Sequence, residues 1–216
     1  MFTSDLLLQF LITLPALLIS MVLHEVSHGY VAYRLGDRTA RQRGRLSLNP
    51  LKHLDKLGSL MLCITYFGSG GSMLFGWAKP VPINPGNFKD PQRGMMWVGA
   101  AGPAANLLIA IASALALKMA YPYPVDSNLF MALFLVFRLN LILMVFNLIP
   151  VPPLDGSRIV GGFLSRQAYV RWIQMDQYGM MFVMLLMFVL IGPLGAGFSS
   201  FFASLYHIFL PASYGF

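Results

Sequence analysis

The chain has 216 residues, of which 57% are hydrophobic and only 11% are charged, and its mean hydropathy is +0.67. A soluble domain of this size could not bury so much apolar surface, so the composition excludes an ordinary soluble protein and predicts an all-α polytopic membrane protein. The formal net charge of +7 would suggest a nucleic-acid partner for a soluble chain. Here the basic residues lie between apolar runs, where they determine topology, and we expect no nucleic-acid partner.

The apolar runs predict about five to six transmembrane helices within one membrane-embedded domain that covers residues 1–216. The first run is long enough to cross most of the hydrocarbon, and Pro15 inside it can be accommodated by neighbouring helices. The last two runs are short for independent spans. The expected segments are 6–35, 95–121, 128–149, 179–191 and 198–210.

A further apolar run at 57–77 differs from the others because five glycines interrupt it and a proline-rich stretch follows it. Seven of the fifteen Lys and Arg residues precede this run, at positions 34–56, and Lys79, Lys89 and Arg93 follow it. Basic loops face the cytoplasm, so both flanks belong on one side of the membrane. We therefore predict a re-entrant segment with a short extended, β-like loop, which must be shielded by protein.

The first predicted helix contains the sequence His24-Glu25-Val26-Ser27-His28 near its basic end. Two histidines four residues apart lie on one helical face, where both imidazoles can bind one metal ion, and a glutamate beside them can take a proton from a metal-bound water. Chance predicts roughly 3 such matches in 10,000 chains of this composition. Glu25 is the only glutamate in the chain, and an ionisable residue within an apolar run indicates function.

A catalytic zinc ion needs a third protein ligand and an open fourth position. The absence of a second glutamate leaves His53, His207 or an aspartate as the third ligand. Asp155 follows the proline-interrupted end of segment 128–149, and it could alternatively cap a helix that begins after it. If 57–77 is re-entrant, Asp155 lies at the same cytoplasmic level as the two histidines, and this topology favours Asp155 as a zinc ligand.

Two further polar residues lie within apolar segments. Asn106 follows small residues that let helices pack closely, which favours an interhelical hydrogen bond, with a contact to substrate as the alternative. Arg138 lies in the middle of segment 128–149, where it is expected either to face a polar cavity or to extend its side chain towards water.

Together the motifs resemble those of the site-2 protease family of intramembrane zinc metalloproteases. The resemblance rests on the His-Glu-x-x-His sequence, on Asn147 with the downstream Pro-x-x-Pro-Leu-Asp-Gly that ends in Asp155 and Gly156, and on the intervening Gly-Pro-x-x-Asn that ends in Asn106. It implies that His24, His28 and Asp155 bind zinc, that Glu25 is the general base and that Asn147 acts on the substrate or the oxyanion. The chain resembles a compact subgroup without PDZ or CBS domains.

The expected activity is hydrolysis of peptide bonds in the transmembrane segments of single-span membrane proteins, with one Zn²⁺ per chain. The expected location is the cell membrane, in contact with the lipid bilayer, with the active site nearer the cytoplasmic side. A homo-oligomer is left open. The alternative is a membrane zinc-binding transporter, but this would require a series of ligands across the membrane and internal pseudo-repeats, which the sequence does not show.

Overall fold

The structure is a computed structural model, which describes residues 4–120 and 128–211. Within these ranges the chain is helical and contains no β-strand, as expected for an all-α membrane protein. Tyr121, the predicted end of segment 95–121, lies outside the described residues. The elements are α1 (Ser4–Arg34), α2 (Thr39–Gln42), η1 (Pro50–Lys52), α3 (Lys56–Gly68), η2 (Pro85–Asn87), α4 (Pro91–Met119), α5 (Asn128–Leu148), α6 (Asp155–Gly161), α7 (Arg166–Gln174), η3 (Met175–Tyr178), α8 (Gly179–Ile191) and α9 (Gly195–Phe209).

Four helical stretches in the described ranges are long and apolar enough to cross a membrane, which is fewer than the five to six helices expected. Three of them correspond to predicted segments. The fourth runs from Arg166 to Leu190, because α7, η3 and α8 follow one another almost without a break, and is longer than the expected 179–191. The remaining apolar helices, α3 and α9, have 13 and 15 residues and are short for independent spans.

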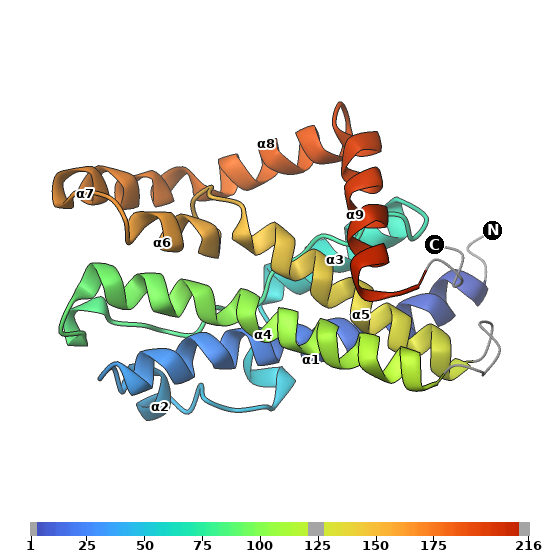
Figure 1. Cartoon of the computed structure of the whole chain (residues 1–216), viewed down its shortest axis with the longest axis horizontal. Helices are drawn as coiled ribbons and strands as arrows, with labels where there is room; N and C mark the ends of the chain where they lie inside the picture. Colours follow the sequence, from blue (N-terminus) through green and yellow to red (C-terminus); the bar gives the residue numbers. More distant parts are fainter. Residues whose placement is uncertain (1–3, 121–127, 212–216) are drawn as a thin grey trace.

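Helix α4 is the central element of the fold and packs against α1, α5 and α6 (Figure 1). The apolar side of α5 is buried between α4 and α9 through Phe130, Phe137 and Leu141. The close approach of α6 requires a glycine at position 99, because a Cβ there would lie 2.7 Å from the Cβ of Arg158. Since α1, α5 and α6 carry the predicted metal ligands and Asn147, their packing on α4 brings these residues together.

The segment between α1 and α4 enters and leaves the bundle on one side. Helix α3, at 13 residues, spans only about 20 Å. The chain then runs back in extended form until Ala78 forms an isolated antiparallel bridge with Leu54, and the Lys79 N–H donates to the His53 carbonyl at 2.8 Å. The start of α3 and the end of the extended segment therefore lie at the same level, which is the geometry predicted for a re-entrant segment.

Asp37 fastens the exit of the extended segment to the end of α1. Its side chain is fully buried and accepts hydrogen bonds from the Asn84 N–H and the Asn87 side-chain amide, both at 2.7 Å, and from the backbone and hydroxyl of Thr39. Burial alone would raise the pKa of this carboxyl, but the hydrogen bonds to Thr39, Asn84 and Asn87 hold the pKa below its ordinary value. The folded structure therefore stabilises the ionised form of Asp37.

The first prediction concerns the side of the membrane on which each loop lies. Single cysteines that replace Arg43, Lys89 and Arg166 in a Cys63→Ser background should react with an impermeant thiol reagent from one side only. A cysteine that replaces Met119 should react from the opposite side, because α4 is about 43 Å long. All four side chains are exposed. Labelling of positions 43 and 89 from opposite sides would contradict the re-entrant path.

The second prediction concerns the stability that Asp37 provides. Asp37→Asn should destabilise the protein by about 1–3 kcal/mol near pH 7, because an amide nitrogen cannot accept the hydrogen bonds that the second carboxylate oxygen accepted. Since the pKa of Asp37 is depressed on folding, its contribution is present above the unfolded pKa of about 3.9 and is lost as the pH falls through the lower folded pKa. The difference between variant and parent should therefore shrink below about pH 4.

Thermal unfolding in detergent across this pH range measures the effect. Asp90→Asn is the matched control, since Asp90 is exposed and caps α4, a task that asparagine performs equally well. An Asp37→Asn protein that unfolds at the temperature of the parent at pH 7 would show that these hydrogen bonds do not fasten the segment.

Candidate metal centre

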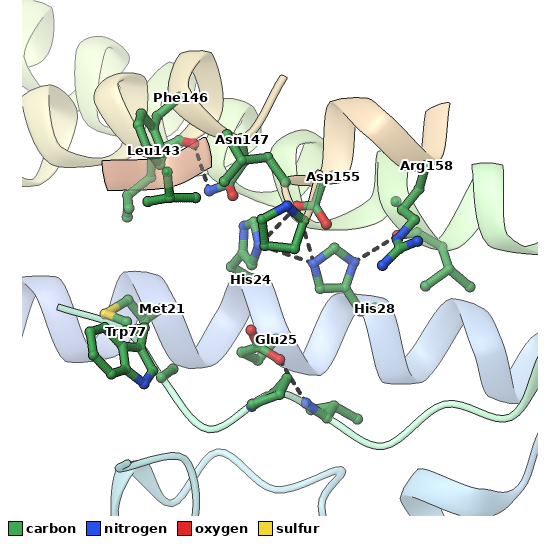
Figure 2. Close-up of a pocket in the computed structure, with 18 of the residues that line it drawn as sticks. Met21, His24, Glu25, His28, Trp77, Leu143, Phe146, Asn147, Asp155 and Arg158 are labelled. Carbon is green, nitrogen blue, oxygen red and sulfur yellow. Dashed lines mark hydrogen bonds and ion pairs between the residues drawn. The ribbon is translucent and has the colours of Figure 1, made fainter. Parts of the chain in front are cut away.

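Three of the residues predicted to bind metal converge at one point inside the bundle (Figure 2). His24 and His28 lie one turn apart on the face of α1 that packs against α4, and they are 9% and 7% exposed. Their Nε2 atoms are 3.0 Å apart. The Oδ2 atom of Asp155 lies 3.1 Å from the Nε2 of His24 and 3.3 Å from that of His28.

The other nitrogen of each imidazole is engaged by an oxygen, which determines where the ring proton lies. The Nδ1 of His28 lies 2.7 Å from the carbonyl oxygen of Val98 on α4. A carbonyl can only accept a hydrogen bond, so Nδ1 carries the proton and a neutral His28 directs the lone pair of Nε2 towards the other two candidate ligands.

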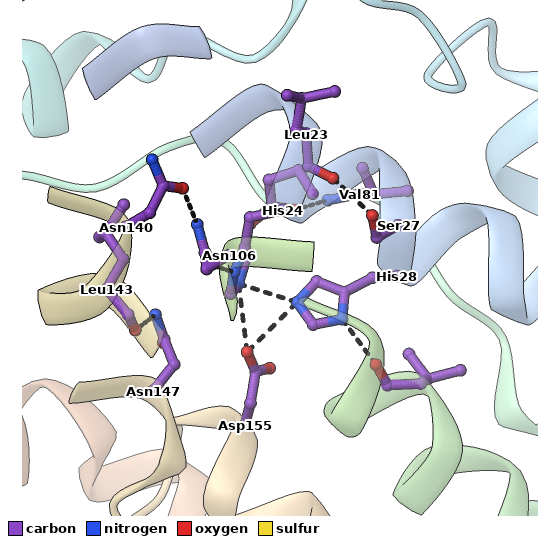
Figure 3. Close-up of polar contacts among 12 residues, drawn as sticks. Leu23, His24, Ser27, His28, Val81, Asn106, Asn140, Leu143, Asn147 and Asp155 are labelled. Carbon is purple, nitrogen blue, oxygen red and sulfur yellow. Dashed lines mark hydrogen bonds and ion pairs between the residues drawn. The ribbon is translucent and has the colours of Figure 1, made fainter. Parts of the chain in front are cut away.

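A chain of buried side chains fixes the proton of His24 in the same way (Figure 3). The hydroxyl of Ser20 donates to the Ala16 carbonyl, so it can only accept from the Asn140 Nδ2, at 2.8 Å. Asn140 then presents its oxygen to the Asn106 Nδ2, also at 2.8 Å. Asn106 is left with its own oxygen facing the His24 Nδ1 at 2.5 Å. Nδ1 therefore donates, and the Nε2 of His24 is free to bind a metal.

Asp155 reaches the histidines from the turn between α5 and α6. It is the first residue of α6, and the N-cap position belongs to Leu154, whose side chain makes no capping hydrogen bond. The alternative in which Asp155 caps a following helix is therefore wrong, since its carboxylate turns towards α1 instead. Its Oδ2 is buried and has no well-formed hydrogen bond within the described residues.

The three atoms fit a zinc ion. A tetrahedral ion about 2.0–2.1 Å from each ligand separates neighbouring ligand atoms by about 3.3–3.4 Å, which is close to the three observed separations. Three atoms that each present a lone pair at this spacing repel one another unless a cation lies between them. The site also requires Gly102, because a Cβ there would lie 2.5 Å from atoms of both imidazole rings.

Glu25 lies beside the histidines but turns towards the extended segment that follows α3 (Figure 2). Its Oε2 accepts a hydrogen bond from the Val81 N–H at 2.8 Å. No hydrogen bond within the described residues engages Oε1, so one carboxylate oxygen remains available. Glu25, both histidines and Asp155 line the same cavity, of about 500 Å³.

The rest of the cavity wall is mostly apolar, with two polar exceptions. Asn147 on α5 donates from its Nδ2 to the Leu143 carbonyl at 2.9 Å, an interaction that leaves its oxygen uninvolved. Arg158 lies one turn after Asp155 on α6, and its guanidinium forms an ion pair with Asp176 at 2.7 Å. The other lining residues include Met21, Phe75, Gly76, Trp77, Phe146 and Val183.

The structure also places the remaining candidates. Asn106 is fully buried behind His24 and does not line the cavity, and the interhelical hydrogen bond that the sequence favoured is present. His53 is buried and bonds through Nε2 to the Ser47 carbonyl at 2.8 Å, outside the metal centre. Sequence reasoning missed Asn140 and Ser20. The signal that could have found Asn140 is an amide in the middle of a mostly apolar run.

The comparisons with known proteins indicate a zinc metalloprotease. A model of peptidase family M50 matches residues 122–191. The chain is 37% identical to the Bacillus subtilis protein named "Putative zinc metalloprotease YwhC", over 83% of this chain and 80% of the relative. It is 31% identical to "Putative zinc metalloprotease Rip2" of Mycolicibacterium smegmatis, over 82% and 67% of the two chains. No solved structure matches significantly.

A more distant relative is named "Zinc metalloprotease MJ0392", from Methanocaldococcus jannaschii. It is 30% identical over 70% of this chain, which spans only 34% of that protein.

Apolar helices around a buried His-His-Asp centre define a zinc-dependent membrane metalloprotease. The chain belongs to peptidase family M50, the site-2 protease family.

The third prediction concerns the metal. His24→Ala and Asp155→Ala should each lose most of the bound zinc, because a site with two protein ligands no longer holds the ion tightly. Asn106→Ala should weaken zinc binding about 10–100-fold while leaving all three ligands in place, because it removes the acceptor that orients His24. Competition with a chromogenic chelator measures the affinity.

His207→Ala is the control for the histidine variants, since His207 is exposed on α9. Ser113→Ala is the control for Asn106, since Ser113 is buried on the same helix and bonds only to the Ile109 carbonyl. Zinc affinity of Asp155→Ala equal to that of the parent would place the third ligand elsewhere.

Proposed function

We propose that the protein hydrolyses peptide bonds within the transmembrane segments of single-span membrane proteins. The observation that carries this proposal is the position of the metal centre within α1, a helix that is long and apolar enough to cross the bilayer. His24 and His28 lie ten and six residues before the basic end of that helix, which is about 15 and 9 Å along its axis. A peptide bond that reaches them must therefore lie at membrane depth.

The short distance from the two histidines to the basic end of α1 also supports an active site nearer the cytoplasmic side of the cell membrane. The end of α1 leads into the stretch with the highest density of basic residues, and such loops remain in the cytoplasm. The Lys79 carbonyl accepts a hydrogen bond from Arg45, which belongs to this basic stretch, and Arg158 lines the cavity of the metal centre.

In the proposed reaction the side chains of the cavity have separate roles. Zinc, when bound, would act as a Lewis acid and supply an activated water. The free Oε1 of Glu25 would accept the proton of the attacking water, while the Val81 N–H holds Oε2 and so fixes the orientation of the carboxylate. Asn147 would stabilise the oxyanion through the Nδ2 hydrogen that does not bond to Leu143, or would hold the substrate, since it lines the cavity next to the ligands.

A helical substrate must unwind before cleavage, because its carbonyl groups are otherwise hydrogen-bonded within the helix. The extended segment after α3 is suited to bind the unwound strand. The backbone of Gly76 lines the cavity and makes no hydrogen bond within the described residues, so it can pair with substrate backbone as an additional strand would. The other edge of the segment is already held by Glu25 and His53.

The rival transporter function requires ligands at several depths. The described residues contain one cluster of potential metal ligands, and the bonds that fix its imidazoles hold them in place rather than pass an ion onward. This arrangement favours hydrolysis.

The fourth prediction tests the role of Glu25. Glu25→Gln should retain zinc and the fold, because a glutamine oxygen can still accept from the Val81 N–H, yet cleavage should fall at least about 100-fold with the loss of the base. The assay is cleavage of a purified single-span membrane protein in vesicles, with the cut site mapped by mass spectrometry. Zinc content and thermal stability are measured on the same samples.

Turnover of the variant at the parental rate would remove Glu25 from the mechanism. Cleavage by the parent only in segments outside the bilayer would contradict the proposed class of substrate.

A further inference from the structure

Arg138 is a charged residue at the middle of a membrane-spanning helix. It lies ten residues from each end of α5, within a candidate membrane span, and its side chain is exposed on the surface of the bundle. Ten residues correspond to about 15 Å of helix, which is longer than an extended arginine side chain. The guanidinium therefore cannot reach water at either end of α5, as a lysine or arginine near a helix end would.

The exposed surface around Arg138 contains a groove. A groove of about 380 Å³ separates α5 from α9 and is distinct from the cavity of the metal centre. Aromatic rings and small side chains line it together with Arg138; they are Phe134, Phe198, Phe202 and Tyr206, with Ser199 and Ala203. We refer to it as the α5–α9 groove.

Within the described residues Arg138 has a polar neighbour but no counter-ion. The polar neighbour is the hydroxyl of Tyr206, which lines the same groove from α9. None of the ion pairs in the described ranges involves Arg138. A charge at this depth is costly, and such residues almost always pair with an opposite charge or mark a functional site. The arrangement leaves the groove with a positive charge that needs an anionic partner.

The chemistry of the surroundings limits what the partner can be. A second copy of this chain is a poor candidate, because two acidic residues are described within the spans and neither is available: Glu25 faces the cavity of the metal centre, and Asp176 is paired with Arg158. A lipid phosphate lies at the headgroup level, about 15 Å from Arg138 along α5. A carboxylate carried to mid-depth by a transmembrane helix of another protein satisfies both limits.

The groove also has the shape that helix association in membranes requires. Ser199 and Ala203 lie four residues apart, on one face of α9, and both line the groove. Small residues at this spacing let a second helix approach the backbone closely. We propose that the α5–α9 groove binds a transmembrane helix of another protein that carries an aspartate or glutamate near mid-depth, with that carboxylate paired to Arg138. Docking requires no cleavage and is independent of the proposed function.

A pair of designed peptides tests this directly. The protein is reconstituted in phosphatidylcholine vesicles, and resonance energy transfer is measured to dye-labelled leucine–alanine transmembrane peptides with either glutamate or glutamine at the centre. The parent should bind the glutamate peptide about tenfold more tightly than the glutamine peptide. Arg138→Gln should abolish this preference, and Arg138→Lys should retain part of it.

A charge reversal gives a second test. Arg138→Glu should prefer a peptide with a central lysine over one with a central glutamate, the opposite of the parent. Circular dichroism and thermal unfolding check that each variant is folded. The comparison of the two peptides on the parent protein needs no variant at all.

Equal binding of the glutamate and glutamine peptides by the parent would overturn the proposal. So would an unchanged preference in folded Arg138→Gln. If phosphatidylglycerol abolishes the preference and is retained on purification by the parent but not by Arg138→Gln, the groove is a lipid site and the proposal is wrong.

Discussion

The metal centre depends on a constraint that the bilayer imposes, which is that a buried polar group must find its hydrogen-bond partner within the protein. Each imidazole meets this requirement through Nδ1, His28 with the carbonyl of Val98 and His24 with the amide of Asn106. Because Nδ1 is used in both rings, the lone pairs of the Nε2 atoms are left to face Asp155. The orientation of both imidazoles for metal binding is thus a consequence of the hydrogen bonds that the surrounding helices provide.

The same constraint explains why three helices must keep their relative positions. The bonds from Asn106 to Asn140 and from Asn140 to Ser20 cross from α4 to α5 and back to α1, and all three side chains are essentially inaccessible. A shift of one helix would leave an amide unpaired in an apolar interior, which is costly. The chain of hydrogen bonds therefore positions His24 and, at the same time, specifies the packing of the bundle.

Sequence reasoning predicted the parts of this arrangement that are local. The spacing of His24 and His28 follows directly from helical periodicity, and the long apolar runs correctly predicted α1, α4 and α5. The continuous stretch from α7 to α8 was missed, because the polar residues Arg171 and Gln174 interrupt the apolar run that a membrane span requires. The sequence favoured an interhelical hydrogen bond for Asn106 but could not identify its partner, since His24 lies 82 residues away.

The central claim is that His24, His28 and Asp155 are the protein ligands of one zinc ion. X-ray absorption at the zinc edge of the purified, zinc-loaded protein tests it most directly. The account predicts a shell of nitrogen and oxygen atoms alone at about 2.0–2.1 Å, with the outer-shell scattering of two imidazoles. A sulfur atom in the shell, which could come only from Cys63 or a methionine, or scattering from a single imidazole would contradict it.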